Sequence, residues 1–99
     1  MFLLRATYNR PIEEVDQLLE GHKAWIMKNF EEGRILLTAR QVPLVGGIIL
    51  ARGESAEEMW AMLEEDPFKS SGMADYEVLE YAPVRAAEGV EGLLEPDAG

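Results

Sequence analysis

The sequence contains no cysteine and only one histidine among its 99 residues. Without cysteine the chain can form no disulfide framework, no thiolate nucleophile and no cysteine-ligated metal site. A single histidine likewise argues against a histidine-rich zinc site. We therefore expect neither a disulfide scaffold nor a resident metal ion.

Positive charge is also scarce, since 9 basic residues stand against 19 acidic ones and the formal net charge is −10. This balance repels nucleic-acid phosphates and anionic membrane surfaces, and no basic cluster offsets it. No apolar run approaches the roughly 20 residues that span a bilayer, and "MFLLRATY" lacks the charged region and long apolar core of a signal peptide. We expect a soluble, cytoplasmic protein that binds neither nucleic acid nor membrane.

Four segments have the composition of β-strands. "MFLLRATY" predicts a strand near residues 2–8, and "YEVLEYAPV" predicts the last one. Between them, "RILLTARQV" and "GGIILARG" are separated by "PLVGG", whose proline and paired glycines predict a loop between antiparallel neighbours.

Two helices are expected between these strands. From Pro11 to Gly33 apolar residues recur at helical spacing, which predicts one continuous helix. Ser55 with a glutamate three residues later forms the capping box of a second helix. We expect that helix to end at the "DPF" step, residues 66–68, and a loop to follow through Gly72.

The predicted order is βαββαβ. With 47% hydrophobic residues, the chain is expected to form one domain with a modest core. This order predicts an α+β, ferredoxin-like fold, an antiparallel four-stranded sheet with both helices on one face. We expect that domain to cover residues 1–84, and residues 85–99 to be an acidic C-terminal tail, loosely ordered or docked on a neighbouring molecule.

The runs "ILL" and "IIL" in the two central segments are unbroken apolar stretches. A sheet with one solvent-exposed face alternates apolar and polar residues, so this pattern predicts that both faces are buried. Because the helices cover only one face, we expect the other to pack against a second copy of the chain, giving a homodimer with two sheets face to face.

Two ionisable residues interrupt the inward-facing stripes of the predicted helices. His22 lies seven positions after Val15 on the first helix, and Asp66 lies seven positions after Met59 on the second. At ~1.5 Å per residue both stand roughly 15 Å from the same sheet edge, so the imidazole and the carboxylate are expected to meet. We expect Asp66 at the C-terminus of the second helix, where the macrodipole disfavours its charge and the histidine compensates.

Such a pair fixes the histidine tautomer and suits general acid/base catalysis on a small-molecule substrate. The alternative is a structural pair in a non-catalytic ligand-binding or interaction module. In that interpretation the histidine is a satisfied core residue and the aspartate before proline forms a turn.

The segments "GHKAWIMKNFEEGRILLTA", "VGGIILARGESAEEMWAMLEEDPFKSSGM" and "YEVLEYAP" resemble the YciI-like, or YCII-related, family over nearly all of residues 1–84. The resemblance implies a dimeric α+β barrel of ferredoxin-like protomers, in which His22 and Asp66 take the positions of the family's histidine–aspartate pair. It also implies a lyase or isomerase that carries out proton transfer or elimination on a small ring compound, without metal or organic cofactor. His22 would be the general base or acid, and Asp66 would orient it.

Four further residues are candidates for a substrate pocket: Arg5, Arg40, Phe68 and Met73. Arg40 stands where many relatives carry the glycine of "AGP", either as an anion-binding side chain or as a solvated loop charge, and we favour the latter. Arg5 interrupts the apolar first strand, and pairing with an acidic side chain is favoured over a place in the pocket. Phe68 and Met73 lie on the predicted loop beside the aspartate.

Overall fold

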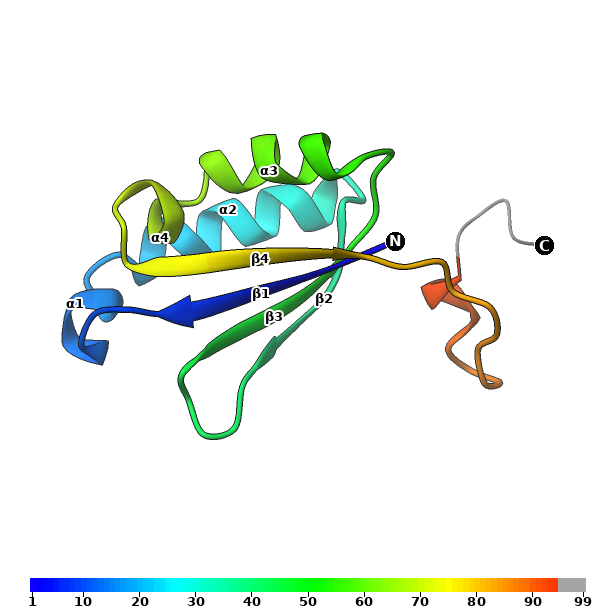
Figure 1. Ribbon diagram of the computed structural model, residues 1–99, viewed down its shortest axis with the longest axis horizontal. Coiled ribbons are helices and arrows are strands. Elements are labelled where there is room, and N and C mark those ends of the chain that lie inside the picture. Colours follow the sequence, from blue (N-terminus) through cyan, green and yellow to red (C-terminus); the bar gives the residue numbers. More distant parts are fainter. Residues whose placement is uncertain (95–99) are drawn as a thin grey trace.

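The computed structural model describes residues 1–94, so residues 95–99 of the predicted tail lie outside the described part. The strands are β1 (Phe2–Tyr8), β2 (Ile35–Arg40), β3 (Gly46–Ala51) and β4 (Ala74–Glu80). The helices are α1 (Ile12–Asp16), α2 (Leu19–Glu31), α3 (Ala56–Glu64) and α4 (Pro67–Ser70), followed by a single 3₁₀ turn, η1 (Glu91–Leu93). Figure 1 shows their arrangement.

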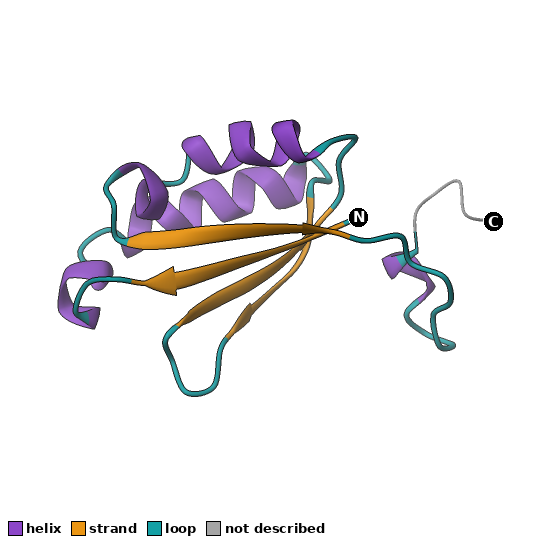
Figure 2. Ribbon diagram, viewed as in Figure 1, coloured by secondary structure: helices purple, strands orange, loops and turns teal. Residues whose placement is uncertain are grey.

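The four strands form one antiparallel sheet in the order β2-β3-β1-β4. The two longest helices, α2 and α3, lie side by side over one face of this sheet (Figures 1 and 2). The predicted α+β arrangement, with an antiparallel sheet and helices on one face, is therefore confirmed.

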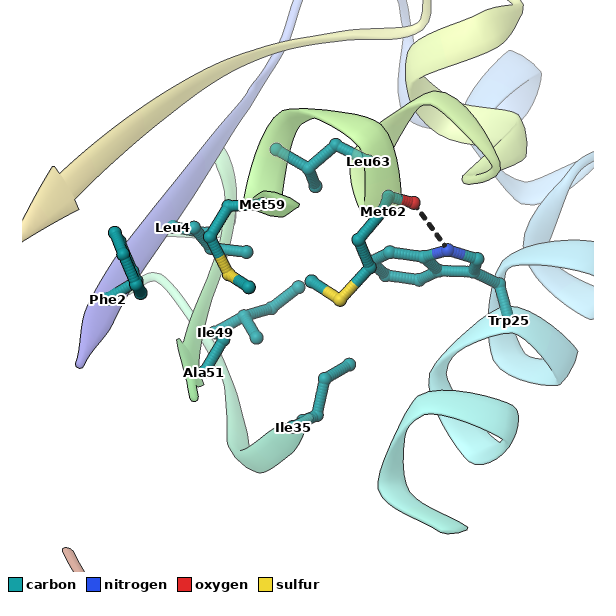
Figure 3. Packing of buried hydrophobic residues seen from close by; sticks show 9 residues of the cluster. All are labelled: Phe2, Leu4, Trp25, Ile35, Ile49, Ala51, Met59, Met62 and Leu63. Atoms are coloured by element: carbon teal, nitrogen blue, oxygen red, sulfur yellow. Dashed lines mark hydrogen bonds between the residues drawn. The ribbon is translucent and has the colours of Figure 1, made fainter. Parts of the chain in front are cut away.

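The main core lies between these two helices and the sheet. Alternate residues of β1 point inward, so Phe2 and Leu4 are buried while Arg5 is exposed. Figure 3 shows the cluster, which consists of Phe2, Leu4, Trp25, Ile35, Ile49, Ala51, Met59, Met62 and Leu63. The indole Nε1–H of Trp25 donates to the carbonyl of Met62 at 3.0 Å, which joins α2 to α3 and satisfies the one polar atom of this side chain.

The predicted helix from Pro11 to Gly33 is in fact two helices, because the chain turns between α1 and α2. This turn lets Val15 pack in a second, smaller cluster with Ala6, Phe68 and Ala74, while α2 packs over the main core. Periodicity alone did not show the break, since apolar residues occur at helical spacing on both sides of it. The predicted stop is confirmed, because Gly33 follows α2 with φ of +77°.

The predicted end of the second helix is wrong. The α3 helix ends at Glu64, and residues 67–70, expected in a loop, form α4. Asp66 is the N-cap of α4 and Pro67 is its first residue, an order that is typical of helix starts. The carboxylate therefore lies at a helix N-terminus and not, as expected, at a C-terminus. Among residues 1–94, no helix combines the length and apolar character needed to cross a membrane.

The capping box at the start of α3 is present in modified form. The Ser55 hydroxyl accepts a hydrogen bond from the backbone N–H of Glu58 at 3.1 Å, as predicted. The Glu58 carboxylate accepts from the N–H of Glu54 at 2.8 Å, one residue before the position expected for a capping box.

The sheet face away from the helices is apolar at its centre. We call this surface the helix-free face. Its residues include Leu3, Leu37, Ile48, Leu50 and Leu79. Leu37 is 42% exposed and Leu79 is 61% exposed. In the single chain the "ILL" and "IIL" runs are thus covered on one side only.

The described part of the C-terminal tail is mostly irregular after β4. The Arg52 guanidinium donates to the carbonyls of Gly92 and Leu94, at 3.3 and 3.4 Å, so η1 contacts the end of β3 in the same chain. Docking of this segment on a neighbouring molecule stays a prediction.

Truncating Met59 tests the core. Met59 is fully buried between α3 and the sheet, so Met59→Ala is expected to lower the free energy of unfolding by about 2–5 kcal/mol. Met27→Ala is the matched control, because Met27 is exposed on α2, and it should change stability by less than about 0.5 kcal/mol. Equal losses in urea unfolding would contradict the described packing.

Candidate active site

The site forms where α2 passes the start of α4. A Cβ placed on Gly21 would lie 3.1 Å from Cγ of Pro67, so a larger residue would require Pro67 to shift by a few tenths of an ångström. Glycine costs about 1 kcal/mol relative to alanine inside a helix. Here it permits the close approach that brings His22, the next residue of α2, to Asp66.

The Asp66 carboxylate is completely buried and has three hydrogen-bond donors. Oδ1 accepts from the Phe68 backbone N–H at 3.1 Å and is 2.8 Å from Nδ1 of His22. Oδ2 accepts from the hydroxyl of Tyr76 on β4. A buried carboxylate requires such partners, and the helix N-terminus adds a favourable dipole. The predicted meeting of His22 with Asp66 is confirmed.

The imidazole of His22 is fixed in position by aromatic rings as well as by this carboxylate. It stacks on Phe68 with ring centroids 3.9 Å apart and planes 4° apart, and Trp25 lies 5.9 Å away at 25°. Since a carboxylate only accepts hydrogen bonds, Nδ1 carries a hydrogen, and in the neutral ring Nε2 presents a lone pair. No hydrogen bond joins Nε2 to another group of residues 1–94.

Tyr76 is the third member of this network. Burial raises the pKa of its hydroxyl far above the ordinary value of 10.0, and the neighbouring Asp66 carboxylate raises it further by its charge and its hydrogen bond. The phenol therefore remains a neutral donor to Asp66. Its position on β4 ties the site to the rigid sheet as well as to the two helices.

A pocket of about 250 Å³ opens beside His22, between α2 and the sheet. Its floor includes one row across the sheet, in which Arg40, Gly47, Ala6 and Tyr76 are successive partners on β2, β3, β1 and β4. Glycine and alanine in the middle of this row leave room above the sheet. The imidazole thus borders a space large enough for a single ring, since a cavity of about 150 Å³ accommodates benzene.

The structure separates the four predicted pocket residues. Phe68 and Arg40 line the pocket with the histidine. Arg5 lies on the helix-free face, where its Nη2 is 2.6 Å from Oε1 of Glu77, so it has the favoured acidic partner and does not line the pocket beside His22. Met73 packs against the second cluster and does not line the pocket, because the α4 turn carries it past the site.

Sequence reasoning missed Tyr76, Tyr8 and Lys23, which all line the pocket. Tyr76 could have been found, since strand alternation places it inward with Ala74 and Val78, and an inward tyrosine hydroxyl requires a partner. Lys23 gives no such signal, because a lysine on an amphipathic helix is normally solvated.

Tyr76→Phe is expected to lower the free energy of unfolding by about 1–3 kcal/mol at neutral pH, because Asp66 loses a donor while staying buried. The raised pKa of Tyr76 gives stability that is present below pH 10 and is lost as the pH rises above it. The difference between wild type and variant should therefore shrink above pH 10, by up to ~1.4 kcal/mol per pH unit.

Urea unfolding at neutral and alkaline pH measures both effects. Tyr81→Phe is the matched control, since Tyr81 follows β4 and lies outside the pocket. A constant difference between wild type and Tyr76→Phe across the alkaline range would contradict the described Tyr76 environment.

Comparison with known proteins gives a family and a structural relative. A family model for the YCII-related domain matches residues 1–82. No curated protein matches the sequence significantly. A similar solved structure is 5-chloro-2-hydroxyhydroquinone dehydrochlorinase (TftG) from Burkholderia phenoliruptrix AC1100, in complex with 2,5-dihydroxybenzoquinone. It superimposes with a TM-score of 0.67 at 18% identity, covering 82% of this chain and 93% of that one.

At this identity the solved structure supports the fold alone. The family model, in contrast, spans β1 to the end of β4 and includes both His22 and Asp66. The resemblance found in the sequence is therefore confirmed, and the chain belongs to the YCII-related family.

Proposed function

We propose that this protein is an enzyme that carries out general acid/base chemistry on a small ring compound, with His22 and Asp66 as its catalytic pair. One observation supports this most strongly: the single histidine lines a pocket while its Nδ1 is held by a fully buried carboxylate. The similar solved structure is a dehydrochlorinase with a single-ring quinone bound, which supports proton transfer or elimination on a ring.

In this mechanism Nε2 of His22 is the base. It accepts a proton from a saturated ring carbon or from a ring hydroxyl, and the carboxylate of Asp66 stabilises the imidazolium that forms. In an elimination from a saturated ring carbon the C–H electron pair becomes the new double bond and the leaving group departs with its bonding pair. In a chlorinated hydroquinone a hydroxyl loses its proton, the ring carbon that bears chlorine takes up a proton, and chloride departs with its bonding pair as a second hydroxyl loses its proton, which leaves a quinone. In an isomerisation Nε2 returns the proton at a second carbon. Neither route requires a cofactor, as the family resemblance implies.

Turnover is tested with 5-chloro-2-hydroxyhydroquinone and a panel of other hydroxylated or chlorinated single-ring compounds. Chloride release reports elimination, and deuterium uptake from solvent reports proton transfer. His22→Asn should lower the rate at least about 100-fold, since a general base contributes that much or more. Asp75→Asn should keep the wild-type rate, because Asp75 is exposed on the opposite face of β4.

A stability measurement shows that lost turnover in His22→Asn is not lost folding. His22→Asn leaves the Phe68 N–H and the Tyr76 hydroxyl on Asp66, so a loss of only about 1–3 kcal/mol is expected and the variant stays folded. Asp66→Asn is less informative, because it places an amide nitrogen, itself a donor, where every neighbouring group donates to Asp66. No turnover by wild type, or full turnover by His22→Asn, would contradict the proposal.

The proposed assembly is a homodimer that joins the helix-free faces of two copies. This face presents leucine and isoleucine side chains to solvent at the centre of the sheet, an arrangement that favours burial against a partner. The ion pair of Arg5 with Glu77 leaves no net charge at that position of the face.

Leu50→Lys tests the dimer, because it places a charge at the centre of the helix-free face. Light scattering should give twice the chain mass for the wild type and the chain mass for this variant. Met27→Lys adds the same charge on the exposed side of α2 and should remain dimeric. A monomeric wild type at micromolar concentration would overturn the proposed assembly.

A further inference from the structure

The charge of the pocket walls is opposite to that of the protein as a whole. The chain has a formal net charge of −10. Yet two cations, Lys23 from α2 and Arg40 from β2, line the pocket, and no acidic side chain of residues 1–94 does so. Asp66 lies behind the imidazole, fully occupied by its three donors. The space therefore favours an anion even though most of the surface repels one.

Neither cation has an acidic partner within ion-pair distance among residues 1–94. Other basic side chains in the helices and strands commonly have an acidic partner; Lys28, for example, pairs with Glu65. Burial raises the pKa of the Tyr8 hydroxyl, the charge of Arg40 lowers it, and the smaller effects of the Asp16 and Asp66 charges raise it. Among these charges Arg40 acts most strongly on the pocket wall. Two unpaired cations around one pocket leave a position for a ligand anion.

The row across the sheet places the positive charge of Arg40 away from Tyr76, the hydrogen-bond partner of Asp66. Arg40 stands at one end and Tyr76 at the other, roughly 14 Å apart by three inter-strand spacings. Between them Gly47 has no side chain and Ala6 has only a methyl group, so the floor is flat and apolar. The pocket above these two residues is lined by both Arg40 and His22.

We propose that the pocket binds a small ring compound that carries a carboxylate, held by Arg40 and Lys23, with the ring above Gly47 and Ala6. A carboxylate is favoured over a more compact anion because the planar guanidinium fork matches its two oxygens. The inference rests on the proposed function only in taking this pocket as the place where the substrate binds. It assigns Arg40 to substrate recognition, where the sequence favoured a solvated charge.

Amide chemical-shift titration of the full chain tests this inference. The two probes are benzoate and benzamide, its uncharged analogue of the same shape. Benzoate is expected to bind more tightly, with shifts centred on the amides of Gly47 and Ala6. Arg40→Gln and Lys23→Gln should each weaken benzoate about fivefold, because exposed charge pairs contribute modestly. The same variants should leave benzamide unchanged.

Lys28→Gln is the matched control, since it removes the same charge from the same helix outside the pocket, and it should bind benzoate as the wild type does. Equal affinity for both probes, no benzoate binding at millimolar concentration, or equal weakening by Lys28→Gln would each overturn the inference.

The titration also separates this inference from the catalytic proposal. His22→Asn keeps both cations, so it should retain the preference for benzoate whether or not His22 is a catalytic base. Loss of that preference in His22→Asn would overturn the assignment of the anion to Arg40 and Lys23.

Discussion

The buried carboxylate of Asp66 is the constraint around which the site is organised. An unpaired carboxylate at zero exposure would be strongly destabilising, so the fold must supply donors from several directions. It does so with the N-terminus of α4, the imidazole of His22 on α2 and the hydroxyl of Tyr76 on β4. These hydrogen bonds fix the positions of α2, α4 and β4 relative to one another. They also hold the imidazole of His22 at the wall of the pocket.

Much of the fold follows from pattern alone. The strands, the order of elements and the single-sided helical layer could be predicted, because period-two and helical patterns report directly which faces are buried. The break between α1 and α2 could not, since both helices are apolar at compatible spacing. The misplaced end of α3 is different, because Asp66 followed by Pro67 is itself a helix-start signal. The seven-residue spacing from Met59, in contrast, favours a continuation of α3 to Asp66.

The site was predictable in its centre and not at its edges. His22 and Asp66 stand out because each is polar on an apolar stripe, and equal heights on neighbouring helices bring them together. The remaining wall of the pocket depends on strand register, which places Arg40, Gly47, Ala6 and Tyr76 in one row. Register is a pairing between distant segments, so the single sequence does not show that Arg40 lies on the pocket side and Arg5 on the other.

The catalytic interpretation depends on which nitrogen of His22 carries the hydrogen. Because the chain has one histidine, ¹⁵N NMR of the imidazole gives one unambiguous pair of resonances. With the neutral ring in its observed place, Nδ1 is predicted to be protonated and Nε2 to be the unprotonated, pyridine-like nitrogen. A wild-type ring protonated on Nε2, with Nδ1 bare, would contradict an Asp66 carboxylate that orients a general base.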